Sequence, residues 1–515
     1  MMKTCCLFLL LLIGIAPASV HAQITAESSQ KQIPVLIRKD DNEVLCVKIT
    51  CPDKTTATLR SLTFTTQGTT DIRDIESIAL YSTGAEKNFA TKSRVGSTLS
   101  AAKEFTVRQQ VKLSEGDNYF WLSAKLKPSA DLFHKIDFQC TKVEADNNTL
   151  TPKDTTPDVV KRIGIAVRNR GDDGSHTYRI PGLVYTTKKT LIGVYDIRWK
   201  NAADLQGDID VGVSRSTDGG QTWLPMKKAI DMKKWGNKPE NQNGVGDPAV
   251  LVDTVTGRIW VAGLWSHGNP GMTWHSSKPG MKPEETSQFL LAYSDDEGAS
   301  WSKPINITEQ IKDPKWQLLL QGPGMGICLK DGTLVFPAQF KDENKVPHST
   351  IIYSKDRGKT WAIGTGAKSK TTEAQVVELQ NGDLMLNMRD DRGGSRSVSV
   401  TSDLGKTWQE HSTSRSALQE PVCMASIIRM KLQDGRNVLV FCNPNTKRGR
   451  THLTLKFSLD DGQTWPEKYN FLLYSEGCYG YSCLAPMDND IVSVLYEGAG
   501  DLYFEKVNVA EVLGR

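Results

Sequence analysis

Five short clusters close to Ser-x-Asp-x-Gly-x-Thr-Trp restrict the fold of this chain more than any other feature. They read SRSTDGGQTW (214–223), AYSDDEGASW (292–301), IYSKDRGKTW (352–361), VTSDLGKTW (400–408) and FSLDDGQTW (457–465), and Thr401 replaces the serine in one copy. A turn of this type between two strands needs a positive φ, which glycine adopts without strain. The aspartate can accept hydrogen bonds from backbone N–H groups of the turn, and the tryptophan can pack under the next strand. The clusters therefore predict five similar hairpins that serve the fold rather than catalysis.

A second repeat, a turn followed by an apolar run, occurs six times in the same part of the chain. Its copies cover residues 186–199, 253–265, 329–340, 379–390, 432–444 and 487–498. They are about 45 to 75 residues apart, which is enough for four short strands per unit. Such a unit cannot bury both of its faces alone, but units arranged radially pack on one another and close a ring. Six copies predict an all-β fold with a six-bladed β-propeller.

The first part of the chain contains neither repeat. Strand-like stretches occur at residues 43–50, 57–66, 77–83 and 119–126, and their alternating apolar residues predict a small β-sandwich. Residues 149–161 are rich in Thr, Pro and Asp, a composition typical of a linker. We therefore expect a sandwich domain over residues 23–157 and the propeller over residues 158–515. The sandwich is a candidate for carbohydrate binding, with simple bracing of the propeller as the alternative.

The N-terminus is typical of a secretory signal. Lys3 precedes the apolar run CCLFLLLLIGIA, and VHAQ (20–23) offers a small-residue cleavage site after Ala22. No second apolar stretch is long enough to cross a bilayer. These features predict a signal peptide over residues 1–22. They also predict a soluble mature protein that is exported to the periplasm or the extracellular space, without a membrane span.

Charge and cysteine content argue against two further classes of protein. The net charge is +4 over 515 residues without a long basic run, so we expect no nucleic-acid partner. Eight cysteines follow the signal segment, which is too few for a disulfide scaffold. Cys46 and Cys51, and likewise Cys478 and Cys483, share a C-x4-C spacing, and either pair could be bridged after export. That spacing is not typical of a zinc site, and we expect neither a metal nor a cofactor.

The five clusters resemble the Asp-box of bacterial sialidases (neuraminidases), the Asp-box or BNR-repeat family of glycoside hydrolases. YRIPGLV (178–184) resembles the Arg-Ile-Pro motif of that family, and the resemblance covers nearly all of residues 158–510. It implies a cluster of three arginines that binds the substrate carboxylate. Arg179, Arg389 and Arg450 match its positions, with Arg448 a near neighbour of the third. A guanidinium is always charged and offers a planar fork to a carboxylate, so three blades can direct three such groups at one point.

The resemblance also implies a tyrosine nucleophile, which sialidases use in place of a carboxylate. Tyr481 in YGYSCLAP (479–486) fits the family's Tyr-Ser-x-Leu pattern better than the nearby Tyr479, and Glu373 in TTEAQVVEL matches the glutamate that takes the phenol proton. Sialic acid has a carboxylate on its anomeric carbon, and a neutral phenol avoids the repulsion that a carboxylate nucleophile would meet. A phenol has a pKa of about 10 and therefore needs a nearby base.

The acid/base residue of the family matches Asp204 in NAADLQGDID, with Asp208 and Asp210 as the alternatives. In the implied mechanism this aspartate first protonates the leaving oxygen and then activates water. It lies in the segment between an apolar strand and the first Asp-box.

Three further positions match residues around the substrate. Arg198 in YDIRW matches an additional arginine that contacts substrate, and Glu497 in VLYEG matches a glutamate that orients Arg179. Asp247 in GVGDPAV fits a position near the 4-hydroxyl and N-acyl groups of the sugar.

Together these positions predict a retaining exo-α-sialidase that releases terminal sialic acid from glycoproteins, glycolipids or oligosaccharides. A trans-sialidase, or an intramolecular sialidase that forms an anhydro sugar, would use the same groups and differ in loops that exclude water or shape an acceptor site. A non-catalytic propeller that binds glycans or protein would have Asp-boxes without the full set of arginines, tyrosine and carboxylates.

Overall fold

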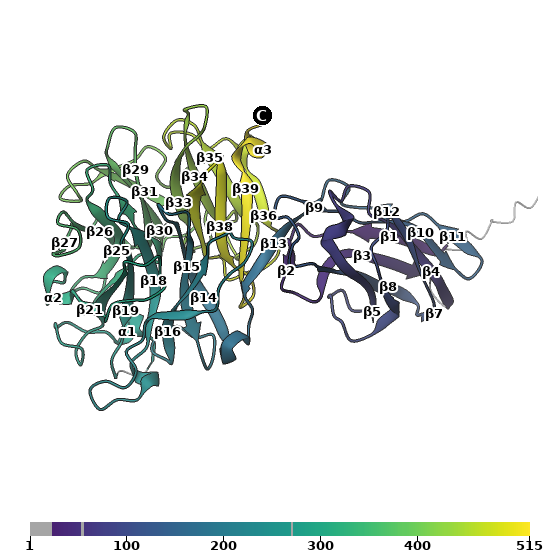
Figure 1. The fold of residues 1–515 in the computed structure, drawn as a ribbon, viewed down its shortest axis with the longest axis horizontal. Coiled ribbons are helices and arrows are strands. Elements are labelled where there is room, and N and C mark those ends of the chain that lie inside the picture. The colour runs from purple at the N-terminus through teal and green to yellow at the C-terminus, as the bar shows by residue number, and fades with distance from the viewer. Residues whose placement is uncertain (1–22, 53–55, 269–270, 515) are drawn as a thin grey trace, which may run out of the picture.

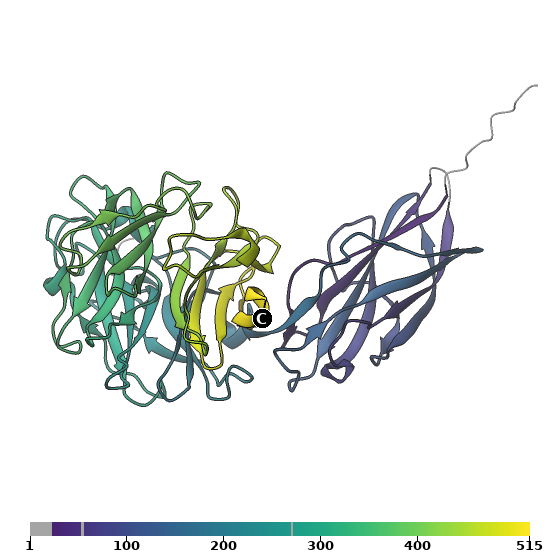
Figure 2. The same ribbon diagram turned by 90° about the horizontal axis from the view of Figure 1, so that it is seen from above.

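The computed structural model describes residues 23–52, 56–268 and 271–514, so the predicted signal peptide lies outside the described residues. Strands dominate and form a smaller N-terminal lobe and a larger lobe built from the rest of the chain (Figure 1). Figure 2 shows that the lobes meet at one side of the larger lobe, near the C-terminus. The described helices are short: α1 (Thr273–Ser276), α2 (Thr308–Ile311), α3 (Val509–Leu513) and the 3-10 turns Ile72–Asp74, Asp172–Gly174, Glu240–Gln242 and Glu467–Tyr469.

The smaller lobe is a sandwich of two β-sheets, with strand orders β12-β1-β3-β8-β5-β6 and β11-β10-β4-β7. The strands of the first sheet are β1 (Thr25–Ser29), β3 (Asn42–Cys51), β5 (Ile75–Gly84), β6 (Arg94–Leu99), β8 (Gly116–Leu126) and β12 (Lys153–Asp154). Those of the second are β4 (Ala57–Thr65), β7 (Glu104–Leu113), β10 (Gln139–Ala145) and β11 (Asn148–Leu150). The four stretches predicted as strands lie in β3, β4, β5 and β8. In β8, Phe120 and Leu122 join the buried core, whereas Tyr119 and Trp121 belong to a second cluster, as the two-residue period of a strand requires.

The larger lobe consists of six sheets. The first sheet contains β14 (Thr177–Tyr185), β15 (Leu191–Arg198), β16 (Ile209–Ser216) and β17 (Lys227–Ile230). The second contains β18 (Val245–Val252), β19 (Ile259–Trp265), β20 (Gln288–Ser294) and β21 (Ile305–Asn306), with β23 (Gly324–Met325) beside β18. Two more sheets contain β29 (Thr371–Glu378), β30 (Leu384–Asp390), β31 (Ser397–Thr401) and β32 (Gln409–Glu410), and β33 (Ser426–Lys431), β34 (Asn437–Pro444), β35 (Leu453–Ser458) and β36 (Phe471–Tyr474), respectively. In a fifth sheet, β22 (Leu318–Gln321) and β24 (Ile327–Cys328) both pair with β25 (Leu334–Lys341). Strand β25 is followed by β26 (Pro347–Ser354), which pairs with β27 (Ala362–Ile363) and β28 (Lys368–Ser369). The last sheet has the order β37 (Ser482–Met487), β38 (Ile491–Glu497), β39 (Leu502–Asn508), β13 (Lys161–Arg168) and β2 (Val35–Ile37).

These sheets are the blades of the predicted six-bladed propeller. The six apolar runs of the second repeat lie in β15, β19, β25, β30, β34 and β38, the second strand of each blade. Inner strands of neighbouring blades pack on one another: β14 on β18, β29 on β33, β33 on β37 and β37 on β14. The last blade takes its outer strand β13 from the start of the lobe, where Ile165 pairs with Phe504. Hydrogen bonds thereby join the two ends of the propeller.

Each Asp-box forms a turn between two strands, as predicted, and these are the third and fourth strands of a blade. In the third copy, the Asp356 carboxylate accepts hydrogen bonds from the Ser354 hydroxyl at 2.8 Å and from the Thr360 N–H and hydroxyl at 2.9 and 2.7 Å. Gly358 has a φ of 83° and donates its N–H to the Ser354 hydroxyl at 2.8 Å. The other four copies repeat these contacts. The clusters thus stabilise hairpins far from the inner strands.

An Asp-box aspartate is expected to make stability sensitive to acid. Hydrogen bonds from Thr360 lower the pKa of Asp356 from 3.8 to about 2. Because the folded pKa is the lower one, the carboxylate stabilises the fold above about pH 4 and loses this contribution as the pH falls through about 2. We expect Asp356→Asn to lower Tm by about 2 °C at neutral pH, with the difference from wild type shrinking below about pH 4. Calorimetry across this range checks the trend; a difference independent of pH would contradict it.

The sandwich and the propeller share backbone hydrogen bonds. Strand β2 pairs in parallel with β13, and β9 (Lys135–Ile136) pairs with β13 antiparallel. Arg38 donates to the carbonyls of Ala166 and Val167 at 3.1 and 2.7 Å. Apolar residues from both lobes, such as Ile136 and Ile163, belong to one buried cluster. Two short strands from the N-terminal part of the chain therefore extend the sheet of the last blade, which stays separate from the two sheets of the sandwich.

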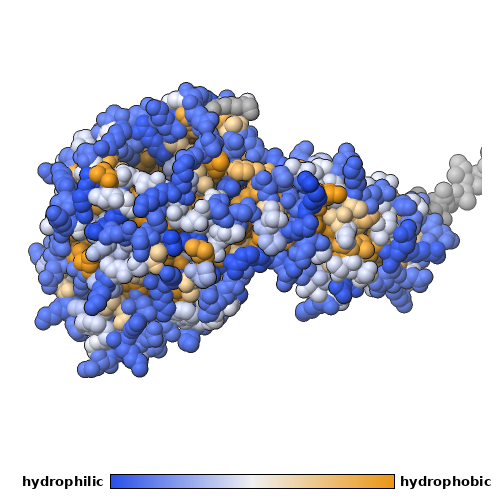
Figure 3. Space-filling view, in the orientation of Figure 1, coloured by the Kyte–Doolittle hydropathy of each residue, from blue (hydrophilic) through white to orange (hydrophobic). Residues whose placement is uncertain are grey.

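The cysteines, the surface and the helices bear on what the sequence predicted about disulfides and membrane spans. The eight described cysteines are free thiols, so neither C-x4-C pair is bridged. Hydrophilic residues cover most of the face seen in Figure 3. Among the described residues, no helix has the length and apolar character that crossing a bilayer needs.

Candidate active site

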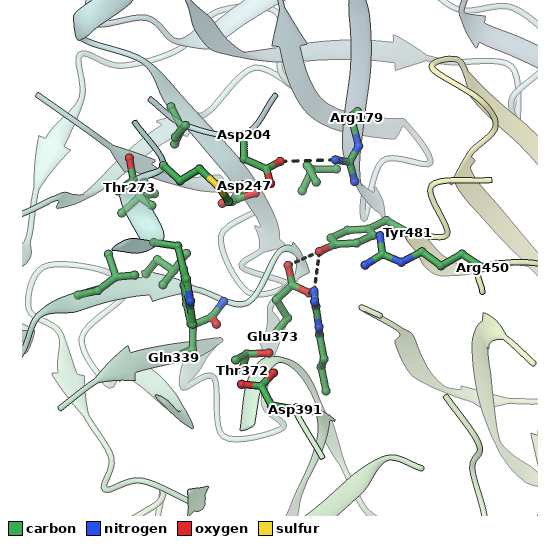
Figure 4. A pocket seen from close by; sticks show the side chains of 18 residues that line it. Arg179, Asp204, Asp247, Thr273, Gln339, Thr372, Glu373, Asp391, Arg450 and Tyr481 are labelled. Carbon is green, nitrogen blue, oxygen red and sulfur yellow. Dashed lines mark hydrogen bonds and ion pairs between the residues drawn. The ribbon is translucent and has the colours of Figure 1, made fainter. Parts of the chain in front are cut away.

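A cavity of about 290 Å³ opens at one end of the propeller ring. Its wall includes residues near the start of the inner strands β14, β18 and β29, the end of β30, and Tyr481 directly before β37. Figure 4 shows Arg179 and Arg450 on one side of the cavity, Thr273 and Gln339 on the other, and Tyr481 pointing between them. Segments that are far apart in the sequence therefore meet at one small volume.

Arg179, Arg389 and Arg450 line one side of the cavity. The Arg179 guanidinium lies 4.5 Å from the ring centroid of Tyr479. Arg450 donates to the carbonyl of Tyr479 at 2.9 Å and to the carbonyl of Val422 at 3.2 Å. The buried Nε of Arg389 has no hydrogen-bond partner among the described residues. Three guanidinium groups in one wall make this side of the cavity a site for an anion.

Tyr481 and Glu373 form the centre of the site. The Tyr481 hydroxyl donates a short hydrogen bond to Glu373 Oε1, and Arg389 Nη1 donates to Glu373 Oε2 at 2.7 Å and to the Tyr481 oxygen at 3.1 Å. Burial and the charge of Glu373 raise the pKa of Tyr481 well above its ordinary value. The phenol therefore keeps its proton until an acceptor takes it, and Glu373 is the acceptor in contact.

Glu497 holds two sides of the site together from behind. Its side chain is fully buried. Oε1 accepts from Arg179 Nε at 3.1 Å and from the Ile180 N–H at 2.9 Å, and Oε2 accepts from the Tyr481 N–H at 2.9 Å. Ile180 has a φ of 59°, an unfavourable conformation for a β-branched residue, in the irregular part of β14. The carboxylate of Glu497 thus fixes Arg179 and Tyr481 relative to each other.

Asp204 lies in the loop after β15 and faces two of the cations. Its carboxylate lies 2.8 Å from Arg198 Nη1 and 3.5 Å from Arg179 Nη1, and its side chain is 54% exposed. Burial would raise the pKa of Asp204, but the positive charges of Arg198 and Arg179 outweigh it and lower the pKa below its ordinary value. Asp204 is therefore ionised at neutral pH.

Asp247 has the opposite electrostatic environment. It lies in β18 with a φ of 56°, and its backbone N–H donates to Asp196 at 2.8 Å. Burial and the negative charges of Asp196, Asp204 and Glu373 raise the pKa of Asp247 well above its ordinary value. Burial and neighbouring charges therefore shift the pKa values of two aspartates of one cavity in opposite directions, a pattern found where acid and base chemistry occur side by side.

An apolar wall faces the arginines. It is formed by Leu205, Leu264, Leu318 and Leu320, which belong to one buried cluster, and by Trp274, which packs against that cluster. Near it, Gln339 Oε1 and Thr372 Oγ1 are buried and have no hydrogen-bond partner among the described residues. The cavity thus combines an anion site, an apolar surface and free polar atoms.

Comparisons with known proteins assign the family. Residues 22–149 match the family described as the N-terminal domain of BNR-repeat neuraminidase, and residues 198–494 match the BNR repeat-like domain. A sialidase of Bacteroides fragilis (strain YCH46) is 43% identical over the full length of both chains. A sialidase of Paraclostridium sordellii is 32% identical over 70% of this chain and 89% of its own length. The solved structure of the Hadza microbial sialidase Hz136 has a TM-score of 0.89 at 43% identity, covering 94% of this chain and 99% of its own.

The chain belongs to the BNR-repeat sialidases. It is a glycoside hydrolase of the sialidase class, and the non-catalytic propeller is set aside.

The sialidase brings all nine predicted site residues together. Seven line the cavity: Arg179, Asp204, Asp247, Glu373, Arg389, Arg450 and Tyr481. The other two, Arg198 and Glu497, lie behind the wall and contact Asp204 and Arg179. The alternatives Arg448, Asp208 and Asp210 do not line it. Asp210 instead accepts a hydrogen bond from Trp199 and pairs with Lys228.

Other residues in or directly behind the cavity wall were not predicted from the sequence. Asp196, two residues before Arg198 on the same side of β15, had a usable signal, because a carboxylate inside the apolar run LIGVYDIR is costly unless it is paired. The apolar wall had none, because its leucines come from β19, β22 and a loop and form no pattern along the chain.

Proposed function

We propose that this sialidase removes terminal α-linked sialic acid from glycoproteins, glycolipids or oligosaccharides by a retaining double displacement with Tyr481 as the nucleophile. The observation that supports this most is the short hydrogen bond from the Tyr481 hydroxyl to Glu373, beside the three arginines. A hydroxyl in contact with a base is an activated nucleophile, and the guanidinium groups match the carboxylate that distinguishes sialic acid from neutral sugars.

Substrate binding uses the three kinds of surface in the cavity. Arg179, Arg389 and Arg450 bind the carboxylate of the sugar. The unpartnered polar atoms of Gln339 and Thr372 are available to its hydroxyl groups. The apolar wall opposite the arginines accommodates its least polar part, the N-acyl group. With the carboxylate held, the anomeric carbon that bears it lies within reach of the Tyr481 oxygen.

The first displacement breaks the bond to the leaving sugar. Glu373 takes the proton of Tyr481 while the phenolic oxygen attacks the anomeric carbon. The bond from that carbon to the aglycone oxygen breaks, and Asp204 gives its proton to the departing oxygen. The product is a sialyl-tyrosine ether and an aglycone alcohol. The arginines offset the negative charge of the substrate carboxylate, which a carboxylate nucleophile would instead oppose.

The second displacement restores the enzyme. Asp204, now a carboxylate, takes a proton from a water molecule while the oxygen of that water attacks the anomeric carbon. The carbon–oxygen bond to Tyr481 breaks, and the phenolate regains its proton from Glu373. Two inversions give net retention, and free sialic acid leaves.

The pH profile is expected to show how substrate binding changes Asp204. In the free enzyme the charges of Arg198 and Arg179 lower its pKa, whereas the first step needs the protonated acid. A bound substrate carboxylate offsets the charge of Arg179 and so raises the pKa of Asp204. The alkaline limb of kcat, which reports the complex, should therefore lie at higher pH than that of kcat/KM, which reports the free enzyme. Coincident limbs would contradict this explanation.

Asp204→Asn is expected to lower kcat/KM on a sialyl-galactoside by about 10²- to 10⁴-fold. The loss should be much smaller on an aryl sialoside, because a phenol leaves without full protonation. Steady-state kinetics on the two substrates measure this difference. An equal loss on both would remove Asp204 from the role of general acid.

Covalent trapping tests the nucleophile and the reaction class together. A 3-fluorosialosyl fluoride needs no acid for its fluoride to leave, and its 3-fluoro group slows turnover of the intermediate. We expect one adduct by mass spectrometry, located on Tyr481 by peptide mapping. NMR of the first product from a natural sialoside should show the α-anomer of free sialic acid. An anhydro sugar, or transfer to added lactose, would favour the alternative sialidase classes instead.

We also propose that the sialidase is exported, on the signal-like segment of residues 1–22. Cell fractionation followed by an activity assay locates the enzyme. Activity confined to the cytoplasm would contradict export.

A further inference from the structure

One buried carboxylate that the mechanism does not use connects two parts of the cavity wall. Asp196 lies in β15 and is 1% exposed. Its Oδ2 accepts hydrogen bonds from Arg198 Nε and Nη2 at 3.1 and 2.9 Å. Its Oδ1 accepts one from the backbone N–H of Asp247 at 2.8 Å. Each oxygen therefore serves a different residue of the site, and the two residues belong to neighbouring blades.

On the first side, Asp196 controls the direction of Arg198. The guanidinium is planar, so binding Nε and Nη2 at one carboxylate oxygen fixes the position of the remaining nitrogen. That nitrogen, Nη1, donates to the carbonyl of Ala202 at 2.7 Å and pairs with Asp204 at 2.8 Å. Asp204 is half-exposed and lies in a loop, whereas Asp196 is buried in a strand. The fixed end of this chain of contacts is therefore Asp196, and the placement of Asp204 depends on it.

On the second side, Asp196 stabilises an unfavourable backbone conformation. Asp247 has a φ of 56°, in the irregular part of β18 between Gly246 and Ala249. A non-glycine residue persists in this conformation only where surrounding contacts hold it. The hydrogen bond to Asp196 is such a contact. A Cβ on Gly246 would lie 3.1 Å from Asp196 Oδ1, so glycine at this position allows the close approach.

We propose that Asp196 is a positioning residue that holds Asp204 and Asp247 at a fixed separation across the cavity without touching the substrate. The proposal rests on the assignment of Asp204 as acid/base under the proposed function. An error of about 1 Å in the placement of a catalytic group is enough to lower a rate by about 100-fold.

The test compares Asp196→Asn with wild type on the aryl sialoside and the sialyl-galactoside. The variant keeps the volume of the side chain, but its amide cannot satisfy Arg198 and Asp247 together. We expect kcat/KM to fall by about 10- to 100-fold on the galactoside and by less than about 5-fold on the aryl substrate. Asp204→Asn, measured alongside, should show the same ordering with a larger loss.

The matched control is Glu505→Gln. Glu505 is also 1% exposed, accepts a hydrogen bond from Tyr496 and lies 3.6 Å from Arg162, away from the cavity. The Glu505→Gln substitution removes a buried carboxylate away from the cavity, so it should change activity on both substrates by less than about 2-fold. A loss of stability alone would lower the activity of a variant equally on both substrates, whereas a positioning defect separates the two substrates and does so only in Asp196→Asn.

A second variant and a crystal structure test the same proposal if Asp196→Asn does not fold. Gly246→Ala disturbs the same contact without removing a charge and should reproduce the substrate-dependent loss if Asp196→Asn does not fold. A crystal structure of either variant should show loop 199–208 displaced. Equal losses on both substrates, unchanged kinetics, or an unmoved loop would overturn the proposal. If Asp204→Asn itself shows no dependence on the leaving group, the proposed role of Asp204 fails, and the crystal structure still decides whether Asp196 positions the loop.

Discussion

Tyr481→Phe is expected to lower kcat on a natural sialoside by about 10³-fold or more while the protein stays folded. The change removes only the phenolic oxygen, which is the atom proposed to attack the anomeric carbon. The ring that packs with Cys423 and Met424 is kept, and Glu373 keeps its contact with Arg389 at 2.7 Å. Loss of a nucleophile is among the largest effects that a single substitution has on an enzyme. Single-turnover kinetics and a thermal melt measure the two quantities.

The control for this prediction is Tyr479→Phe. Tyr479 lies two residues away and presents its ring to Arg179 and its carbonyl to Arg450, and both contacts survive the loss of the hydroxyl. We expect kcat within about 3-fold of wild type. If Tyr479→Phe lost activity and Tyr481→Phe did not, the nucleophile would be assigned to the wrong tyrosine.

Glu497→Gln is expected to damage stability and catalysis together. Glu497 accepts hydrogen bonds from Arg179, Ile180 and Tyr481 through two oxygens. A glutamine has one acceptor oxygen, so its NH₂ group must face at least one of these donors, and Arg179 loses its buried partner. Breaking a buried ion pair in this way costs about 3 kcal/mol of unfolding free energy. Because Arg179 and Tyr481 lose their common anchor, kcat/KM should fall by about 10²- to 10³-fold.

Urea unfolding and steady-state kinetics measure these effects, again with Glu505→Gln as the control. Burial raises the pKa of Glu505 to about 7, so at neutral pH this side chain is already partly neutral and glutamine resembles its protonated form. We expect a smaller loss of stability and near wild-type kinetics. A Glu497→Gln variant with normal KM and kcat would show that the clamp on Arg179 and Tyr481 has no role in the reaction.

The repeats made the architecture predictable because the contacts that form each Asp-box hairpin lie within one short segment of sequence. Asp356, Gly358 and Thr360 satisfy one another within a single turn, so the contact can be inferred from seven residues of sequence. The apolar runs likewise mark the second strand of every blade. The same reasoning did not anticipate that β2 and β9 pair with β13, because an edge strand is paired by whatever segment lies beside it in space.

In the active site, too, some features could be predicted from the sequence and others could not. Motif matches located the residues to which we assign chemical roles in the proposed function, since a guanidinium, a phenol or a carboxylate at a matched position is visible in the chain itself. The contacts that orient them are not visible, because they join residues far apart in sequence: Glu497 lies 318 residues from Arg179, and Tyr481 lies 108 residues from Glu373.

The sequence by itself therefore determined the blade repeat and the fold class and predicted the candidate reactive groups, all of which depend on local patterns. Only the tertiary structure decided the direction in which the pKa of each carboxyl group shifts, downward for Asp204 and upward for Asp247. It alone decided which buried acids hold the site in place, as in Glu497 and Asp196. The physical reason is that burial and neighbouring charge set both properties, and these arise only when six blades from distant parts of the chain meet around one cavity.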